Sequence, residues 1–266
     1  MNFLQAIILG AIEGVAEFLP ISSTGHLILA SNLLQIQQSE FVKSFEIIVQ
    51  SGAILAVIVL YWKKIFSNIE LGKRVIAAFI PTAIIGFILY KFIKHYLLGN
   101  VDVVLVSLLV GGIALIGVEL LMARGKWRVA NGENSKSNSK LPAISYKQSA
   151  IIGLFQSIAV IPGVSRSASS IVGAMLLGLD RVSATEFSFL LAVPTMLAAT
   201  ALDLKSVGFS FSGNEWLVLA TGFISSFIVA LISIKWLLNY VKTNTYIPFG
   251  IYRIALAILY FFLIVK

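Results

Sequence analysis

The sequence predicts an all-α integral membrane protein made of two inverted-topology repeats, each with one re-entrant helical hairpin and three transmembrane helices. Three observations lead to this prediction: an apolar composition, a series of apolar runs of two distinct lengths, and a similarity between the two halves of the chain. The whole chain, residues 1–266, is expected to form a single membrane domain.

The composition is too apolar for a soluble domain. Of the 266 residues, 58% are hydrophobic and 12% are charged, and the mean hydropathy is +0.95, whereas soluble domains carry about 25% charged residues. The chain has no cysteine, which excludes disulfides and thiolate chemistry. The net charge is +8, but the basic residues fall between apolar runs rather than on one polar domain, so a nucleic-acid partner is excluded.

The first half of the chain combines two short apolar runs with three long ones. Residues 3–12 and 27–34 are each too short to cross about 30 Å of hydrocarbon. They are expected to form a re-entrant hairpin, whose polar turn needs protein or a water-filled cavity around it. The longer runs, which are expected to span the membrane, are residues 45–62, 75–92 and 103–123.

The second half repeats this order after a polar linker. The linker covers residues 124–147 and separates repeat one, residues 1–123, from repeat two, residues 148–266. Repeat two opens with two short runs, residues 150–161 and 168–179, separated by PGVSRS. The spans expected after them are residues 187–202, 216–238 and 246–265.

Two segments of the first half align with segments of the second. GAIEGVAEFLP from Gly10 is similar to GLFQSIAVIP from Gly153, and FEIIVQSGAILA from Phe45 aligns without gaps to FSFLLAVPTMLA from Phe187. A nearly constant offset between such matches indicates an internal repeat. Because each repeat would cross the membrane three times, the second would be inverted relative to the first. The two polar turns would then enter from opposite faces and meet near the midplane.

The basic residues predict the orientation of this topology. Loops on the face of the N-terminus would hold few of them, and loops on the opposite face would hold most of the rest. By the positive-inside rule the opposite face is cytoplasmic, so both termini are expected outside. The few basic residues on the N-terminal face are Lys43, Lys91, Lys94, Lys205 and Lys266.

The stretch EGVAEFLPISSTGH, residues 13–26, places a dense polar cluster within apolar sequence. Buried polar clusters of this kind in a membrane protein are functional-site candidates. Glu13 and Glu17 are four residues apart and therefore share one helix face, where two ionised carboxylates repel. Three arrangements relieve the repulsion: protonation of one carboxylate, an ion pair with Arg166 or His26, or a bridging divalent cation such as Mg²⁺ or Ca²⁺.

A hydroxyl-rich turn follows the two carboxylates. Pro20 ends the first helix, and Ser22, Ser23 and Thr24 are residue types that suit the start of a second helix. His26 can gain or lose a proton near neutral pH, so it can act as an acid, a base or a nucleophile. The alternative is a structural histidine that only hydrogen-bonds a neighbouring carbonyl. Because two carboxylates and an arginine are expected to converge there, we favour the functional role.

Arg166 lies in PGVSRSASS, between the two short runs of the second half. A guanidinium stays charged in proteins and needs an anion at this depth, either Glu13 or Glu17 of the other turn or a bound phosphate. Ser165 and Ser167 add hydroxyls beside it, and the N-terminus of the following helix would direct its N–H groups to the same place. The structural alternative is an Arg–Glu pair that only ties the repeats together.

These motifs resemble a known family. EGVAEFLPISSTGH and PGVSRSAS are similar to the two signature motifs of the undecaprenyl-diphosphate phosphatase family, the bacitracin-resistance phosphatases of bacterial membranes, and residues 45–57 resemble a third block. The resemblance implies hydrolysis of undecaprenyl diphosphate to undecaprenyl phosphate and inorganic phosphate. This reaction recycles the lipid carrier for peptidoglycan synthesis and confers bacitracin resistance. The fold that the resemblance implies also has inverted repeats, two re-entrant hairpins and six spans.

The resemblance also implies roles for individual residues. It places the acidic pair on Glu13 and Glu17, the candidate nucleophile on Ser23, the histidine on His26 and the phosphate-binding arginine on Arg166. Serine attack, histidine attack and attack by an activated water remain alternatives. The remaining polar positions of the motifs, which would contact the substrate, are Ser22, Thr24, Ser165 and Ser167.

The expected partners and location follow from the same resemblance. The substrate is a polyprenyl diphosphate lipid, the environment is the bacterial plasma membrane, and the active site would face the outer side. The sequence leaves open whether Glu13 and Glu17 hold a divalent cation and whether a second copy forms a homodimer. A lipid flippase is the rival function, because inverted repeats with broken helices are typical of transporters.

Overall fold

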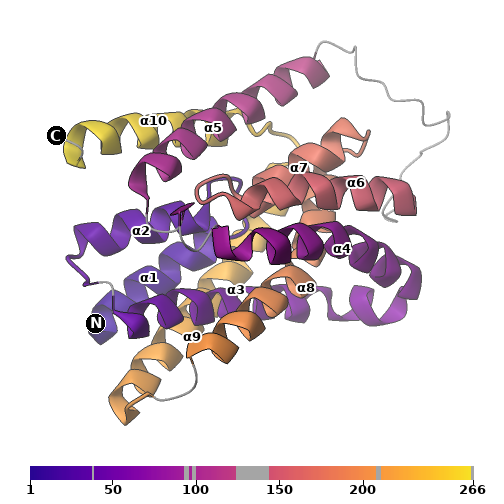
Figure 1. Ribbon diagram of the computed structural model, residues 1–266. Helices are drawn as coiled ribbons and strands as arrows, with labels where there is room; N and C mark the ends of the chain where they lie inside the picture. The colour runs from indigo at the N-terminus through magenta and orange to yellow at the C-terminus, as the bar shows by residue number, and fades with distance from the viewer. Residues whose placement is uncertain (38, 93–95, 98–99, 124–143, 208–210, 265–266) are drawn as a thin grey trace.

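The computed structural model describes residues 1–37, 39–92, 96–97, 100–123, 144–207 and 211–264 (Figure 1). Within these ranges the chain is helical and contains no strand. The long helices of the first half are α3 (Glu40–Ser67), α4 (Ile69–Phe92) and α5 (Val101–Ala123), and those of the second half are α8 (Arg181–Val207), α9 (Gly213–Tyr240) and α10 (Ile247–Ile264). The shorter elements are α1 (Phe3–Ala16), α2 (Ser23–Leu33), α6 (Tyr146–Ser157), the 3₁₀ helix η2 (Ile158–Val160) and α7 (Arg166–Leu176).

The prediction of an all-α membrane protein is confirmed. In the described part of the chain, five helices are long and apolar enough to cross a membrane: α3, α4, α5, α8 and α9. The predicted sixth span corresponds to α10, which has 18 residues and whose described apolar part is shorter than the other five. At 1.5 Å per residue, an 18-residue helix is about 27 Å long, which is at the lower end of the range for a span.

The four short helices form two hairpins, α1–α2 and α6–α7, where the sequence predicts pairs of half-helices. In Figure 1 the first hairpin opens towards the left and the second towards the right, so their turns meet inside the molecule. We define the first turn as residues 17–22 and the second turn as residues 158–165. Helix α1 packs mainly on α9, helix α6 mainly on α4, and α5 pairs with α10, so each hairpin rests on a long helix of the other half.

Matched contacts recur in the two hairpins. Each begins with a capping box, Asn2 with Gln5 on α1 and Ser145 with Gln148 on α6. The Gln5 amide also donates to the Leu34 carbonyl, and the Gln148 amide to the Leu177 carbonyl, across the same 29-residue separation. The two hairpins are therefore closed by the same side-chain type at the same relative positions.

The predicted linker, residues 124–147, lies mostly outside the described residues. At its described end α6 begins at Tyr146, with Ser145 as its cap. Serine and glutamine at the two capping positions initiate the helix within a segment whose polar composition indicated a loop.

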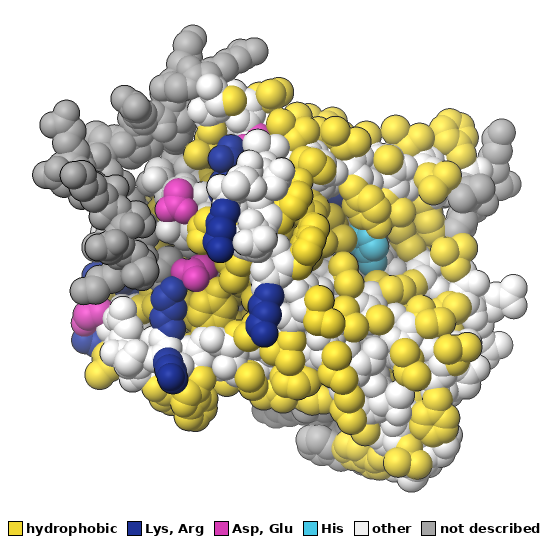
Figure 2. Space-filling model, turned by 180° about the vertical axis from the view of Figure 1, so that it is seen from behind, with side chains coloured by type: hydrophobic (Ala, Val, Ile, Leu, Met, Phe, Trp, Pro, Cys, Tyr) yellow, Lys and Arg dark blue, Asp and Glu magenta, His cyan; other side chains and the backbone are white. Residues whose placement is uncertain are grey.

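The N-terminus and the end of α10 lie at the opposite end of the molecule from the Lys and Arg side chains of the face in Figure 2. The N-terminus and the end of α10 are both at the left of Figure 1. Figure 2 shows the same molecule from behind, and the Lys and Arg side chains of this face gather towards its left, which corresponds to the right of Figure 1. Elsewhere on this face the surface is largely hydrophobic, as expected for a lipid-facing wall.

Candidate active site

The two turns have the same local conformation where their second helices begin. Ser22 is the N-cap of α2 with φ +76°, and Ser165 is the N-cap of α7 with φ +78°. Each serine hydroxyl accepts a backbone N–H of its own helix, from Gly25 and from Ala168 respectively. A positive φ is unfavourable for serine and costs about 1–3 kcal/mol, so the surrounding contacts must hold both turns in place.

The turns bring Ser23, Glu17 and Arg166 together. The Ser23 hydroxyl donates to Glu17 Oε2 at 2.6 Å, and Arg166 donates from Nε and Nη2 to Glu17 Oε1, both at 3.1 Å. The Glu17 and Arg166 side chains are 4% and 10% exposed, respectively. Of the two carboxylates considered for Arg166, Glu17 is therefore the one that pairs with it, and this carboxylate contacts the serine and the arginine at the same time.

Helix α8 supports Arg166 from the other side. Arg166 Nη1 donates to the Ser188 carbonyl at 2.9 Å, and the hydroxyls of Ser188 and Ser170 lie 2.7 Å apart. On the Glu17 side, Phe18 packs edge-on against Phe189 of α8, with ring centroids 5.1 Å apart. The same segment of α8 therefore positions both turns.

A polar cavity of about 90 Å³ lies at the meeting point of the turns. Such a volume holds a few water molecules or one small anionic group. It is bordered by carboxylate, hydroxyl and guanidinium groups, and by the helix starts that follow Ser22 and Ser165. The lining residues are Glu17, Ser22, Ser23, Thr24, Gln50, Gly163, Ser165, Arg166 and Met196.

Ser167 has a different position from the other predicted substrate-binding residues. It is not among the residues that line the cavity, and its hydroxyl donates to the Leu19 carbonyl of the first turn at 2.9 Å. Ser165 and Ser167 also lie within hydrogen-bond distance, 3.1 Å between their Oγ atoms. In this structure Ser167 therefore connects the two turns.

The His26 ring does not join the group around Glu17. Its Nδ1 lies 2.8 Å from the Ser22 carbonyl and its Nε2 lies 2.7 Å from the Tyr252 hydroxyl on α10. The two rings are stacked, with centroids 5.5 Å apart. His26 is also absent from the lining of the polar cavity. The geometry is that of a histidine which connects α2 to α10, and a chemical role for His26 stays a prediction.

Glu13 is fully buried, and no described residue forms a hydrogen bond with either of its carboxylate oxygens. An unpartnered buried carboxylate is costly, and a cation would relieve that cost. Within the described residues, however, no three His, Cys, Asp or Glu side chains gather as a metal cluster. Glu13 and Glu17 fit a divalent cation only if water or phosphate oxygens supply the remaining ligands, as is usual for Mg²⁺.

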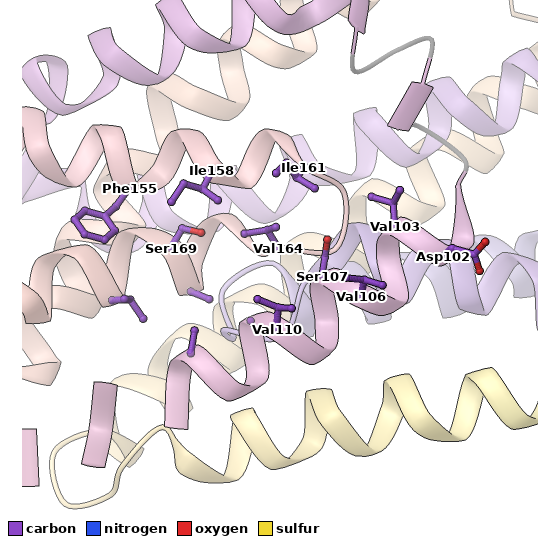
Figure 3. A pocket seen from close by; sticks show the side chains of 14 residues that line it. Asp102, Val103, Val106, Ser107, Val110, Phe155, Ile158, Ile161, Val164 and Ser169 are labelled. Atoms are coloured by element: carbon purple, nitrogen blue, oxygen red, sulfur yellow. The ribbon is translucent and has the colours of Figure 1, made fainter. Parts of the chain in front are cut away.

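A larger cavity of about 660 Å³ lies between α5 and the α6–α7 hairpin, and its walls are almost entirely apolar. Figure 3 shows Val106 and Val110 on one side of this cavity and Phe155 and Ile158 on the other. Val164 of the second turn lines it, while the preceding and following residues line the polar cavity. The second turn therefore borders both a polar and an apolar space.

Several residues of the site belong to no motif of the sequence. Ser188 and Met196 lie within predicted spans and belong to no motif that stood out. Arg253 lies within the span predicted over residues 246–265, and in the structure it is fully buried on α10 and contacts both turns. One available signal was its charge, because an ionisable residue within a span is a functional candidate by default.

Comparison with known proteins shows the family of this chain. Residues 6–259 match the family described as Bacitracin resistance protein BacA. The Undecaprenyl-diphosphatase of Aquifex aeolicus (strain VF5) is 52% identical over 260 residues, which cover 98% of both chains. The Undecaprenyl-diphosphatase of Sulfurihydrogenibium sp. (strain YO3AOP1) is 50% identical over 261 residues, which cover 98% of this chain and 99% of the relative. The chain therefore belongs to the bacitracin resistance protein BacA family.

Proposed function

We propose that this protein is a membrane phosphatase that hydrolyses undecaprenyl diphosphate to undecaprenyl phosphate and inorganic phosphate, and so recycles the lipid carrier for peptidoglycan synthesis. The names of its relatives support this assignment. The single observation that carries it is the contact of Ser23 and Arg166 with one carboxylate, Glu17, beside a small polar cavity. The apolar cavity next to the second turn suits a substrate with a polyprenyl chain.

In the proposed mechanism Ser23 attacks the terminal phosphorus. Glu17 accepts the hydroxyl proton along the existing 2.6 Å hydrogen bond, while the bond from phosphorus to the bridging oxygen breaks and undecaprenyl phosphate leaves. Glu17 passes this proton to the departing phosphate oxygen and is a free base again. Water then attacks the phosphoserine and gives one proton to Glu17, which transfers it to the Ser23 oxygen as the bond from that oxygen to phosphorus breaks and inorganic phosphate is released. We favour Ser23 over His26 because the His26 ring is bonded to Tyr252 and not to Glu17.

Positive charge at the cavity stabilises the transferring phosphoryl group. Arg166 can donate in a bidentate manner to two phosphate oxygens through Nε and Nη2, the nitrogens that both donate to Oε1 of Glu17 in this structure. Helices α2 and α7 both begin at the cavity, so the positive ends of their dipoles lie where negative charge develops. If a divalent cation binds, Glu13 and Glu17 would hold it, and it would neutralise phosphate charge.

We also propose the inverted-repeat topology in the membrane, with two re-entrant hairpins and both termini outside. The matched capping boxes and glutamine contacts of the hairpins support it. The orientation is supported by the basic side chains of the face in Figure 2, which gather at the end of the molecule opposite the N-terminus and the end of α10. The active site would then open to the outer side of the plasma membrane.

The test is phosphate release from a polyprenyl diphosphate by the purified full chain and by Arg166→Ala. We expect multiple turnovers from the wild type and loss of turnover in the variant, because the buried phosphate would lose its counter-charge. A matched control is Lys73→Ala, which removes an exposed charge paired with Glu70. Normal turnover by a membrane-inserted Arg166→Ala protein would contradict the assignment of Arg166 to the phosphate site. A wild type without turnover would favour the flippase alternative.

A further inference from the structure

Arg253 on α10 is a fully buried cation whose hydrogen bonds all go to backbone carbonyls. A guanidinium has five N–H donors, and five carbonyls accept from this one. They lie 3.0–3.4 Å from its nitrogens, and no carboxylate is among them. The acceptors are the carbonyls of Pro20, Ser107, Leu108, Gly163 and Val164.

These acceptors come from three separate parts of the chain. Pro20 belongs to the first turn, Gly163 and Val164 to the second turn, and the other two to α5. The same Nη1 atom donates to both turns, to Pro20 at 3.3 Å and to Val164 at 3.0 Å. Since each contact is directional, the guanidinium fixes the position of one turn relative to the other.

These contacts also orient the peptide group that leads into Ser165. The C=O and N–H of a trans peptide point in opposite directions, and the peptide bonds of the described residues, including that from Val164 to Ser165, are not cis. When the Val164 carbonyl points at Arg253, the Ser165 N–H therefore points away from it. Ser165 itself has the unfavourable φ of +78° and lines the polar cavity. Arg253 thus holds the peptide next to a strained residue of the site.

Helix α5 has a glycine where Arg253 needs space. A Cβ atom at Gly111 would overlap Nη2 of Arg253 and would lie 2.7 Å from its Cζ. Any side chain at position 111 would therefore displace the guanidinium. By contrast, a Cβ at Gly117 on the same helix would meet no atom within 4 Å.

We propose that Arg253 is a positioning residue for phosphate transfer. It holds the two turns at the separation at which Ser23 with Glu17 and Arg166 face one phosphate group, and Gly111 provides the space it occupies. This inference rests on the proposed function. This positioning role differs from a direct role in substrate binding, since the hydrogen bonds of Arg253 are all directed to backbone carbonyls.

The experiment compares Arg253→Lys, Gly111→Ala and Gly117→Ala with the wild type, as full chains in detergent, using phosphate release from a polyprenyl diphosphate. The rate is expressed per folded molecule, with the folded fraction taken from size-exclusion chromatography and thermal unfolding. Lysine keeps the charge but has three donors on a single nitrogen, so it cannot satisfy the five carbonyls that Arg253 contacts. Gly111→Ala keeps Arg253 and displaces it.

We expect Arg253→Lys to lower kcat by about 10²-fold with KM nearly unchanged, because small misplacements of reacting groups have effects of this size. Gly111→Ala should lower kcat in the same way, and Gly117→Ala should match the wild type. A folded Arg253→Lys or Gly111→Ala protein with wild-type kcat would overturn the proposal.

Two other results would also overturn the positioning role. A raised KM at unchanged kcat would mean that Arg253 acts on substrate binding. Failure of both variants to fold would mean that it is needed for folding alone. Failure of the proposed function is recognised separately, since in that case the wild type itself releases no phosphate.

Discussion

At the scale of single residues, Glu17 is the centre of the candidate site. Its two carboxylate oxygens have different partners, since Oε2 accepts from Ser23 and Oε1 accepts from Arg166. Removing one partner of a buried ion pair leaves an uncompensated charge, which costs about 3–5 kcal/mol. Substitutions at Glu17 therefore change stability as well as chemistry, so Ser23 and His26 are better positions for testing the mechanism.

Ser23→Ala and His26→Gln should separate the serine and histidine mechanisms. We expect Ser23→Ala to lower turnover by about 10⁴–10⁶-fold, because the variant lacks the attacking nucleophile. His26→Gln should keep most of the turnover, because a glutamine can still hydrogen-bond Ser22 or Tyr252. The measurement is steady-state phosphate release, and Thr221→Ala on α9 is the control for loss of a hydroxyl that bonds only its own helix.

The opposite ranking would support histidine chemistry. If Ser23→Ala turned over normally while His26→Gln was inactive, the serine mechanism would be wrong, and the His26 ring would have to leave Tyr252 during the reaction.

At the scale of helices, the two hairpins depend on close backbone contacts. Helix α1 approaches α9 at Gly10, where a Cβ would meet the carbonyl of Gly222. Helix α6 approaches α4 at Gly153, where a Cβ would overlap the carbonyl of Ala78. Without a hydrophobic effect between helices in lipid, small residues at such crossings allow the packing contacts that hold helices together.

Gly153→Ala should therefore destabilise the protein. The added methyl has no room against the backbone of α4, and overpacking of this kind costs about 1–3 kcal/mol. Gly72→Ala on α4 is the matched control, because a Cβ there meets no atom within 4 Å, and alanine is the better helix former. Thermal unfolding in detergent measures both variants. Equal midpoints for Gly153→Ala and the wild type would contradict the close approach of α6 to α4.

At the scale of the whole molecule, the proposed orientation can be measured directly because the chain has no cysteine. A cysteine introduced at Gln37, between α2 and α3, should react with a membrane-impermeant maleimide in intact cells. A cysteine at Lys242, between α9 and α10, should react only after the membrane is permeabilised. Both positions are exposed in the structure.

Labelling of both variants in detergent is the control for reactivity. Labelling of the Lys242 cysteine but not the Gln37 cysteine in intact cells would show that the protein has the opposite orientation in the membrane. Equal labelling of both positions in intact cells would contradict the proposed placement of these loops on opposite faces.

Much of the molecule follows from local sequence. The apolar runs and their lengths predicted the helices and the membrane class, because the cost of unpaired backbone groups in lipid leaves few alternatives. Pro20 and the serines after it predicted a break followed by a new helix, and Ser22 is the N-cap of α2. The sequence also singled out Glu17, Ser23 and Arg166, since polar groups within apolar sequence are costly unless they have partners.

The choice of partners depended on the tertiary structure. The spacing of Glu13 and Glu17 does not predict which of them pairs with Arg166, because both acids share one helix face. The packing of α7 against the first turn brings Arg166 to Glu17. Glu119 likewise has no partner nearby in sequence, and the fold provides Arg181 at its carboxylate. Arg253 lies far from both turns in the chain, and its carbonyl partners exist only once α5, α10 and the hairpins have assembled. Local sequence thus determined the helices and the reactive residue types, while long-range packing decided which of those residues meet.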